Sequence, residues 1–200
     1  MTNYKHSNKN RVIETAASLF LKVGYTYTSM DEVVQQSGVS KSNVYYHFSS
    51  KEELLLAVID FWITIYREKL EDILKQTNLT LEEKMLTFLE SLAEEIEERD
   101  YQGSCPFITF IMQAPKNDRQ VQEKINHFFD YLTRICEGLI QEGINTKAFR
   151  EDINVKETAE IFVNNLEGAL FLAEVKKRVS ISLLQPKIYL NYSFKSNFFI

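Results

Sequence analysis

Apolar residues recur every three to four positions along most of the chain, the spacing of helices that bury one face. The first such stripe comprises Val12, Ile13, Ala16, Ala17, Phe20 and Val23. Gly24 follows it directly, so the sequence predicts a first helix closed by a left-handed glycine. Thr28 and Asp31 have the spacing of a capping box, which predicts a short second helix. The inward residues of that helix would be Met30, Val33 and Val34.

A tight turn at residues 37–39 separates the second helix from a third, which we expect from Lys41 to Phe48, with Ser40 as its cap. Ser50 and Glu53 repeat the capping-box spacing and therefore predict a long fourth helix. The apolar stripe of the fourth helix comprises Leu55, Val58, Ile59, Trp62, Ile65, Tyr66, Leu70 and Ile73.

Four further helices follow in the same pattern. Thr80 and Glu83 open a fifth helix. A sixth, from Cys105 to Gln113, is apolar on nearly all sides, which predicts that it is buried. A seventh is expected at about 119–142, closed by Gly143, and an eighth at about 155–178. The inward face of the seventh would comprise Val121, Ile125, Phe128, Leu132, Ile135 and Leu139.

The last part of the chain is harder to interpret. A short helix is expected at about 180–190, although residues 179–184 also alternate as a strand would. Pro186 interrupts any longer helix. No other segment alternates in this way, so the sequence predicts an all-α protein.

Composition limits the classes of protein. The 200 residues are 44% hydrophobic and 26% charged, which suits one or two small globular units. No apolar run approaches the roughly 18 residues of a membrane span, and the polar first residues do not resemble a secretory signal. The two cysteines, Cys105 and Cys136, are too few for a disulfide framework. We therefore expect a cytoplasmic protein with no membrane partner.

Charge is distributed unevenly along the chain. Residues 1–51 contain six lysines and arginines against three acidic residues, whereas the remaining residues contain 17 basic and 25 acidic ones. A basic segment on an acidic body is compatible with a local site for a polyanion such as nucleic acid. A merely solvated charged face is the alternative.

Residues 28–51 contain two short helices separated by a glycine turn, which is the arrangement of a helix-turn-helix unit. An ordinary helical hairpin would have the same geometry, but the polar content of the third helix favours DNA binding. Its side chains outside Val44 and Phe48 can all donate hydrogen bonds to phosphates or base edges, and none is a carboxylate. They are Ser40, Lys41, Ser42, Asn43, Tyr45, Tyr46 and His47. Lys51 lies in the first turn of the next helix, where the helix dipole also favours a phosphate.

The segment from Arg11 to Leu56 resembles the DNA-binding domain of the TetR family of bacterial transcriptional regulators. The motifs that carry the resemblance are Gly24-Tyr25, Thr28, Gly38-Val39-Ser40-Lys41, Tyr45-Tyr46-His47-Phe48 and Lys51-Glu52-Glu53-Leu54. The resemblance implies a three-helix DNA-binding domain at residues 1–50. A long fourth helix would join it to a helical ligand-binding and dimerisation domain at residues 51–200.

The resemblance also implies roles for individual residues. Phosphate contacts are expected of Thr28, Tyr45, Tyr46, His47 and Lys51. Contacts with bases or adjacent phosphates are expected of Ser40, Lys41, Ser42 and Asn43. The family often has glycine where Ser42 stands.

The rest of the chain resembles a subgroup of the family at Gly103-Ser104-Cys105-Pro106, Asp118-Arg119 and Asn165-Leu166-Glu167-Gly168-Ala169. The resemblance implies a double-stranded DNA operator, a small-molecule effector and a homodimer formed through the C-terminal helices. Small residues that would let helices approach closely are Ala159, Gly168, Ala169 and Ala173. Candidates for lining an effector pocket are Trp62, Tyr66, Phe88, Phe107, Phe110, Met112, Phe128 and Phe162.

The sequence does not indicate an enzyme. The histidines His6, His47 and His127 have no partners at metal-ligand spacing, so we expect no metal, no catalytic residues and no cofactor. Cys105 is either a reactive thiol at a helix start or a small buried residue. The expected function is a repressor that a mostly apolar ligand releases from a palindromic operator. The alternative is a helical ligand-binding or interaction protein that no longer regulates through DNA.

Overall fold

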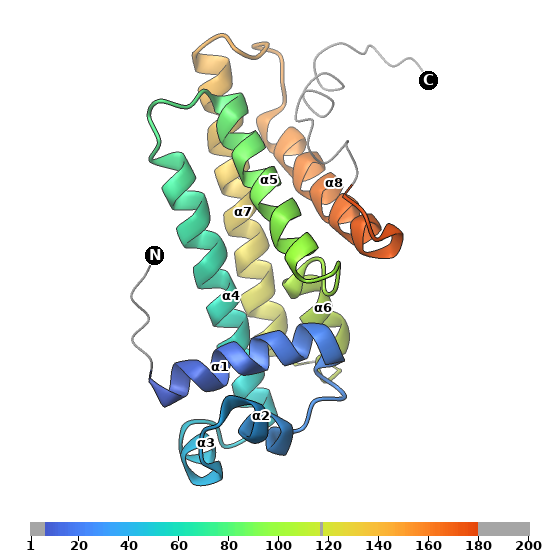
Figure 1. The fold of residues 1–200 in the computed structure, drawn as a ribbon. Helices are drawn as coiled ribbons and strands as arrows, with labels where there is room; N and C mark the ends of the chain where they lie inside the picture. Colours follow the sequence, from blue (N-terminus) through green and yellow to red (C-terminus); the bar gives the residue numbers. More distant parts are fainter. Residues whose placement is uncertain (1–6, 117, 180–200) are drawn as a thin grey trace. The chain divides into compact units, whose positions relative to one another are not determined.

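The computed structural model describes residues 7–116 and 118–179. Within these ranges the chain forms eight α-helices, one π-helical segment and no strand, so the expectation of an all-α protein is confirmed (Figure 1). The elements are α1 (Asn8–Leu19), η1 (Phe20–Gly24), α2 (Met30–Ser37), α3 (Lys41–His47), α4 (Lys51–Leu74), α5 (Leu81–Glu98), α6 (Pro106–Gln113), α7 (Arg119–Asn145) and α8 (Val155–Lys176). The helix or strand expected beyond Val179 lies outside the described residues.

The chain divides into two compact units. The first unit contains the described residues up to Arg67 and those from Pro106 to Asn126. The second contains Glu68–Cys105 and the described residues from His127 onward. The first unit thus holds α1, η1, α2, α3 and α6, the second holds α5 and α8, and α4 and α7 run from one unit into the other. The division at residue 50 stays a prediction, since this first unit also includes most of α4.

The first unit is built on α1, which packs against both α2 and α3 and lies across the first part of α4 (Figure 1). Its fully buried side chains include Val12, Ala16, Phe20, Val33 and Val44. Because these residues come from α1, η1, α2 and α3, no single helix of the group could bury them alone.

The end of the first helix differs from the expectation. The α-helix stops at Leu19, and η1 continues as a π-helical turn to Gly24. A π-turn holds more residues than an α-turn, so it rotates the following side chains out of register with the stripe. Val23, expected inside, is 46% exposed, whereas Leu21 is buried. Gly24 has a φ of +102°, as its glycine identity allows.

The cap of α2 is shifted by one residue from its predicted position. Ser29 is the N-cap, and its Oγ accepts a hydrogen bond from the N–H of Glu32 at 3.1 Å. Ser29 and Glu32 have the same chemistry and spacing as Thr28 and Asp31, so the pattern alone could not choose between the two pairs.

The other two predicted capping pairs are present. The N–H of Glu53 donates to Ser50 Oγ at 3.1 Å. Thr80 and Glu83 form a reciprocal capping box at the start of α5.

In α7 the helix passes through Gly143 and ends at Asn145, so the expected glycine terminus is wrong. A Cβ at Gly143 would overlap the ring of Phe149, whose N–H donates to the Gly143 carbonyl at 2.9 Å. The glycine therefore lets the chain fold back onto the helix. The inward face also ends differently, because Cys136 and Ile140 are buried in place of Ile135 and Leu139.

The burial of α6 and of the small residues of α8 also differs from the expectation. Helix α6 is not buried on all sides, since Met112 is 79% exposed. Ala159 and Ala173 are core residues of the second unit, whereas a Cβ at Gly168 would meet nothing within 4 Å. None of the described helices is both long enough and apolar enough to cross a membrane.

Candidate nucleic-acid interface

The turn between α2 and α3 fixes the orientation of α3. Gly38 caps α2 in the left-handed conformation, with a φ of +64°, and Val39 is buried beside it. Arg11 of α1 donates from its guanidinium to the Ser37 carbonyl at 2.7 Å, which binds the end of α2 to α1. Val44 and Phe48 bury the inward side of α3, as the pattern predicted.

The outward side of α3 carries seven polar side chains, which we call the α3 face: Ser40, Lys41, Ser42, Asn43, Tyr45, Tyr46 and His47. Asn43 and His47 are half-buried and the other five are exposed; the Tyr46 side chain reaches 81% exposure and contacts the His47 ring edge-on. Each of these groups can donate a hydrogen bond to an acceptor in DNA. Because none is negatively charged, the face does not repel a phosphate backbone.

Lys41 already has an acidic partner. Its Nζ lies 2.8 Å from Asp31 Oδ1, and this hydrogen bond raises the pKa of the ammonium. Both side chains are exposed, and exposed ion pairs contribute little to stability. A phosphate can therefore compete with Asp31 for Lys41.

The amide of Asn43 is incompletely satisfied. Its Oδ1 is buried and has no hydrogen-bond partner in the described part of the chain. A buried acceptor without a donor is costly, so the side chain would gain by rotating toward a donor on a base edge.

The ammonium of Lys51 binds backbone carbonyls within the first unit. Its Nζ donates to the carbonyls of Tyr25 at 2.9 Å, Thr28 at 3.0 Å and Thr26 at 3.4 Å. It also lies 4.5 Å from the centroid of the Tyr25 ring, a cation–π distance. With these contacts Lys51 ties the loop before α2 to the start of α4.

Thr28 is likewise turned inward. Its side chain is 1% exposed, and its hydroxyl donates to the Gly24 carbonyl at 2.9 Å. A direct phosphate contact through the side chain of Thr28 or Lys51 would require either group to leave its carbonyl partners.

The sequence analysis named Tyr25 only as part of a family motif and missed both its contacts and Gln113. The Tyr25 N–H donates to Gln113 Oε1 at 2.5 Å, across 88 residues of sequence, and its hydroxyl lies 3.5 Å from Glu52. Burial, with the nearby Glu52 carboxylate, raises the pKa of Tyr25 to about 12. No local pattern marks Gln113, because only the packing of α6 in the first unit brings it to Tyr25.

The candidate effector-pocket residues separate between the units. In the first unit Trp62, Tyr66 and Phe107 form a run of ring contacts, with centroids 6.0 Å and 5.6 Å apart, and Phe110 is buried as well. Buried in the second unit are Phe88, Phe128 and Phe162. The exposed Met112 does not belong with either group.

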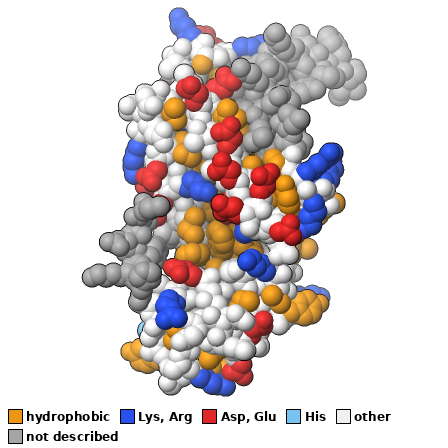
Figure 2. Space-filling model, viewed as in Figure 1, with side chains coloured by type: hydrophobic (Ala, Val, Ile, Leu, Met, Phe, Trp, Pro, Cys, Tyr) orange, Lys and Arg blue, Asp and Glu red, His pale blue; other side chains and the backbone are white. Residues whose placement is uncertain are grey.

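The second unit has an acidic outer helix. Figure 2 shows acidic side chains in a row over α5. Its exposed glutamates include Glu90, Glu94, Glu97 and Glu98. Such a surface repels DNA.

The two cysteines are buried. Neither Cys105 nor Cys136 forms a disulfide with a described residue, and burial raises the pKa of the Cys136 thiol to about 12. No group of three His, Cys, Asp or Glu residues able to hold a metal ion occurs in residues 7–116 and 118–179.

A polar, carboxylate-free helix presented behind a glycine turn on a three-helix unit defines a helix-turn-helix DNA-binding protein. Residues 12–58 match the family model described as bacterial regulatory proteins of the tetR family. Residues 82–181 match the model described as the tetracyclin repressor-like C-terminal domain. The chain belongs to the TetR family, whose members are DNA-binding transcriptional regulators and not enzymes.

Individual relatives are similar over nearly the whole chain. The regulator YfiR of Bacillus subtilis is 25% identical over 94% of this chain and 92% of its own length. The regulator QacR of Staphylococcus aureus is 29% identical over 92% of this chain and 96% of its own. The crystal structure of a TetR regulatory protein from Rhodobacter sphaeroides has a similar fold, with a TM-score of 0.81 and 19% sequence identity. The match covers 93% of this chain and 98% of that protein's chain.

Proposed function

We propose that this chain is a repressor that binds a palindromic operator as a homodimer and leaves it when a small, mostly apolar ligand binds. The observation that carries the proposal is the α3 face, on which seven neighbouring side chains can donate hydrogen bonds and none is acidic. Such a face is complementary to the phosphate oxygens and base acceptors of a major groove.

Different residues of the α3 face take different parts in this proposal. Phosphate contacts are assigned to Tyr45, Tyr46 and His47. Contacts with base edges or adjacent phosphates are assigned to Ser40, Lys41, Ser42 and Asn43. Thr28 and Lys51 act from behind the face, because their carbonyl contacts hold the loop that leads into α2.

The proposed dimer rests on the outer side of α8. Four of its large apolar side chains are exposed, and they share one face of the helix with the open position Gly168. We call this face the α8 stripe: Ile161, Gly168, Phe171, Leu172 and Val175. A second copy of the chain, related by a two-fold axis, would cover both stripes at once. Two copies present two α3 faces, which accounts for a palindromic operator.

The proposed effector is supported by the aromatic side chains buried in both units. Helix α4 offers a path for coupling, because it starts at Lys51, carries Trp62 and Tyr66 in the first unit and ends in the second. A ligand that favours one tilt of α4 would change the spacing of the two α3 faces. Such coupling is typically about 1–3 kcal/mol and acts equally in both directions.

Selection of bound fragments from the organism's genomic DNA by the purified protein tests the central part. We expect the recovered fragments to share an inverted repeat. Recovery of fragments without a common sequence would overturn the proposal.

A ligand screen by thermal shift, followed by operator binding with each hit, tests the effector. We expect stabilising apolar ligands to weaken operator binding. Hits that stabilise the protein and leave operator affinity unchanged would contradict the coupling.

A further inference from the structure

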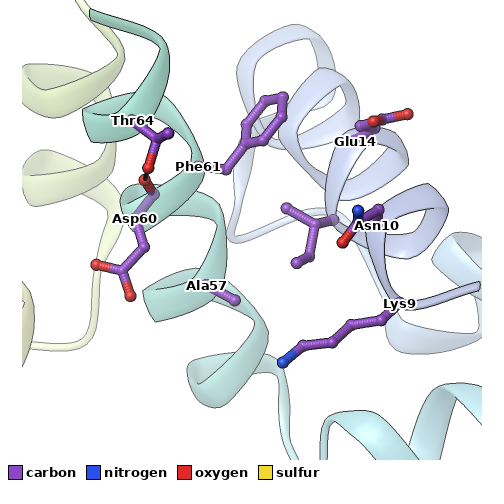
Figure 3. A pocket seen from close by; sticks show the side chains of 8 residues that line it. Lys9, Asn10, Glu14, Ala57, Asp60, Phe61 and Thr64 are labelled. Carbon is purple, nitrogen blue, oxygen red and sulfur yellow. Dashed lines mark hydrogen bonds between the residues drawn. The ribbon is translucent and has the colours of Figure 1, made fainter. Parts of the chain in front are cut away.

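A groove of about 270 Å³ lies between α1 and α4 within the first unit (Figure 3). Its walls are one side of each helix, including Lys9, Ile13 and Glu14 of α1 and Ala57, Asp60 and Phe61 of α4. Neither the α3 face nor the α8 stripe contributes to it. The groove therefore belongs to neither of the surfaces proposed for DNA and for the second copy.

Three of the side chains that line the groove are apolar, and the polar side chains of Asn10 and Thr64 line it as well. Ile13, Ala57 and Phe61 are all half-buried there, and Ala57 and Phe61 lie four residues apart on one side of α4. In Figure 3 the Ala57 methyl group and the Phe61 ring both point toward α1. This surface suits a short hydrocarbon chain or a small ring.

The charged side chains around the groove are not equivalent. Figure 3 shows Lys9 extending toward α4, whereas the carboxylates of Asp60 and Glu14 point away from the space between the helices. Asp60 is also paired, with Lys124 Nζ 2.5 Å from its Oδ1. The ammonium of Lys9 is thus the charge that faces the groove.

Lys9 has only weak interactions of its own. Its Nζ lies 5.9 Å from the centroid of the Phe48 ring and has a long-range attraction to Glu53. The described part of the chain contains no ion pair of Lys9. An anion in the groove would therefore find a cation that no carboxylate has neutralised at close range.

We propose that this groove binds a small amphipathic organic anion, of the class of medium-chain or aryl carboxylates. The hydrocarbon part covers Ile13, Ala57 and Phe61, and the carboxylate lies at Lys9. The groove is close to the lower end of the roughly 300–1,000 Å³ typical of ligand pockets, which restricts the occupant to a small molecule. Because the ligand touches both α1 and α4, its binding stabilises the unit that carries α3.

Octanoate is the probe for this site, with octylamine and octanol as charge controls. The full chain is labelled with ¹³C in the methyl groups of isoleucine and alanine, and the probe is titrated by NMR. We expect the Ile13 and Ala57 methyl signals to shift with octanoate, and octylamine and octanol to bind at least about fivefold more weakly. These two methyl groups separate the groove from any effector site elsewhere in the chain.

Three variants locate the anion. Lys9→Gln should weaken octanoate binding about fivefold, and Ala57→Phe, which fills the groove, should abolish the shift of Ile13. Lys22→Gln is the matched control, because Lys22 is an exposed lysine of the same unit outside the groove, and it should leave binding unchanged. Helical circular dichroism and thermal melting establish that Ala57→Phe is folded.

Octanoate that shifts other methyl signals and leaves Ile13 and Ala57 unmoved would overturn the proposal. Equal binding of octylamine, or unchanged binding by Lys9→Gln, would overturn the assignment of the anion to Lys9. None of these three results bears on operator binding, which is measured separately.

Discussion

Two exposed helix faces of this chain differ in nearly every respect. The α3 face consists of hydroxyl, amide, imidazole and ammonium groups, and its inward side is buried by Val44 and Phe48. The α8 stripe consists of apolar side chains around an open glycine, with Phe171 56% exposed. Water solvates the first face well and the second face poorly.

The contrast indicates what each face is for. A face of donors without carboxylates is stable in water and gains only when it meets an array of acceptors, as DNA provides. Exposure of an apolar stripe to water is unfavourable, and its burial lowers the free energy. We therefore expect an identical stripe to cover it permanently. We therefore assign transient contact with DNA to α3 and lasting contact with a second copy to α8.

The largest expected effect comes from a charge in the α8 stripe. Phe171→Glu would bury an unpaired carboxylate at the proposed interface, which costs about 3 kcal/mol or more, or at least about a hundredfold in dimer affinity. Operator affinity should fall with it, since one α3 face reads too few base pairs. Sedimentation equilibrium and operator binding measure the two effects. Lys156→Glu, an exposed position of α8 outside the stripe, is the control and should change neither.

Two results would contradict this assignment: the Phe171→Glu variant stays dimeric, or it dissociates and still binds the operator with undiminished affinity. In the first case α8 would not be the contact between copies. In the second case a single chain would be sufficient to recognise DNA.

The inner side of α8 should respond to pH. Burial raises the pKa of Glu167 from 4.5 to about 7, although a hydrogen bond with Cys105 opposes the shift. The folded state then holds the proton more tightly than the unfolded state, so the free energy of unfolding falls as the pH rises from about 4.5 to about 7. Glu167→Gln removes the ionisation and should stabilise the chain at pH 8 by up to about 3 kcal/mol.

Urea unfolding at pH 5 and pH 8, at one protein concentration, measures this difference. The gain should be clearly smaller at pH 5, where the wild-type carboxyl is mostly protonated. A gain of equal size at both values would mean that burial of the charge is not its cause.

On the α3 face, Asn43→Ala should cost about 1–3 kcal/mol on the preferred operator, which is typical of a lost pair of base contacts. The loss should be smaller on operators altered at the base pair that Asn43 contacts. A parallel titration of the wild type and the variant on such a set of operators measures it. A uniform loss on all operators would instead place Asn43 at the phosphate backbone.

The sequence predicted the glycine turn before α3 and the two residues that α3 buries, because both depend on local chemistry within residues 37–48. It also predicted the number and order of the described helices. The predictions of the α2 cap and of the end of α7 were wrong, because the local pattern was ambiguous in the first case and the deciding contact lay outside the helix in the second. Ser29 and Glu32 repeat the spacing of Thr28 and Asp31, and the need for glycine at Gly143 depends on Phe149.

The contacts of Lys51 likewise could not be predicted from local sequence patterns. Its position at the start of α4 is compatible with a phosphate contact, and only the three-dimensional structure reveals the three carbonyls of the preceding loop around its ammonium. The Tyr25–Gln113 hydrogen bond joins residues 88 positions apart, so no motif could indicate it.

The smallest expected effect on DNA binding is a difference in salt dependence between variants of Lys41 and of Lys51. Lys41→Met should reduce the slope of log affinity against log salt by about one per chain, because it removes a phosphate contact. Lys51→Met should leave that slope unchanged and lower the melting temperature, because its carbonyl partners lose their donor. Operator titrations at several salt concentrations, together with thermal unfolding, measure both. A reduced slope for Lys51→Met would show that Lys51 leaves its carbonyls for a phosphate.

The stoichiometry of the complex with DNA decides whether two copies bind the operator together. Native mass spectrometry of the protein with a duplex containing one selected inverted repeat gives the number of chains bound. We expect two chains on each duplex and none singly bound at equilibrium, since the α8 stripes keep the copies together. A single chain bound specifically to the duplex would contradict it.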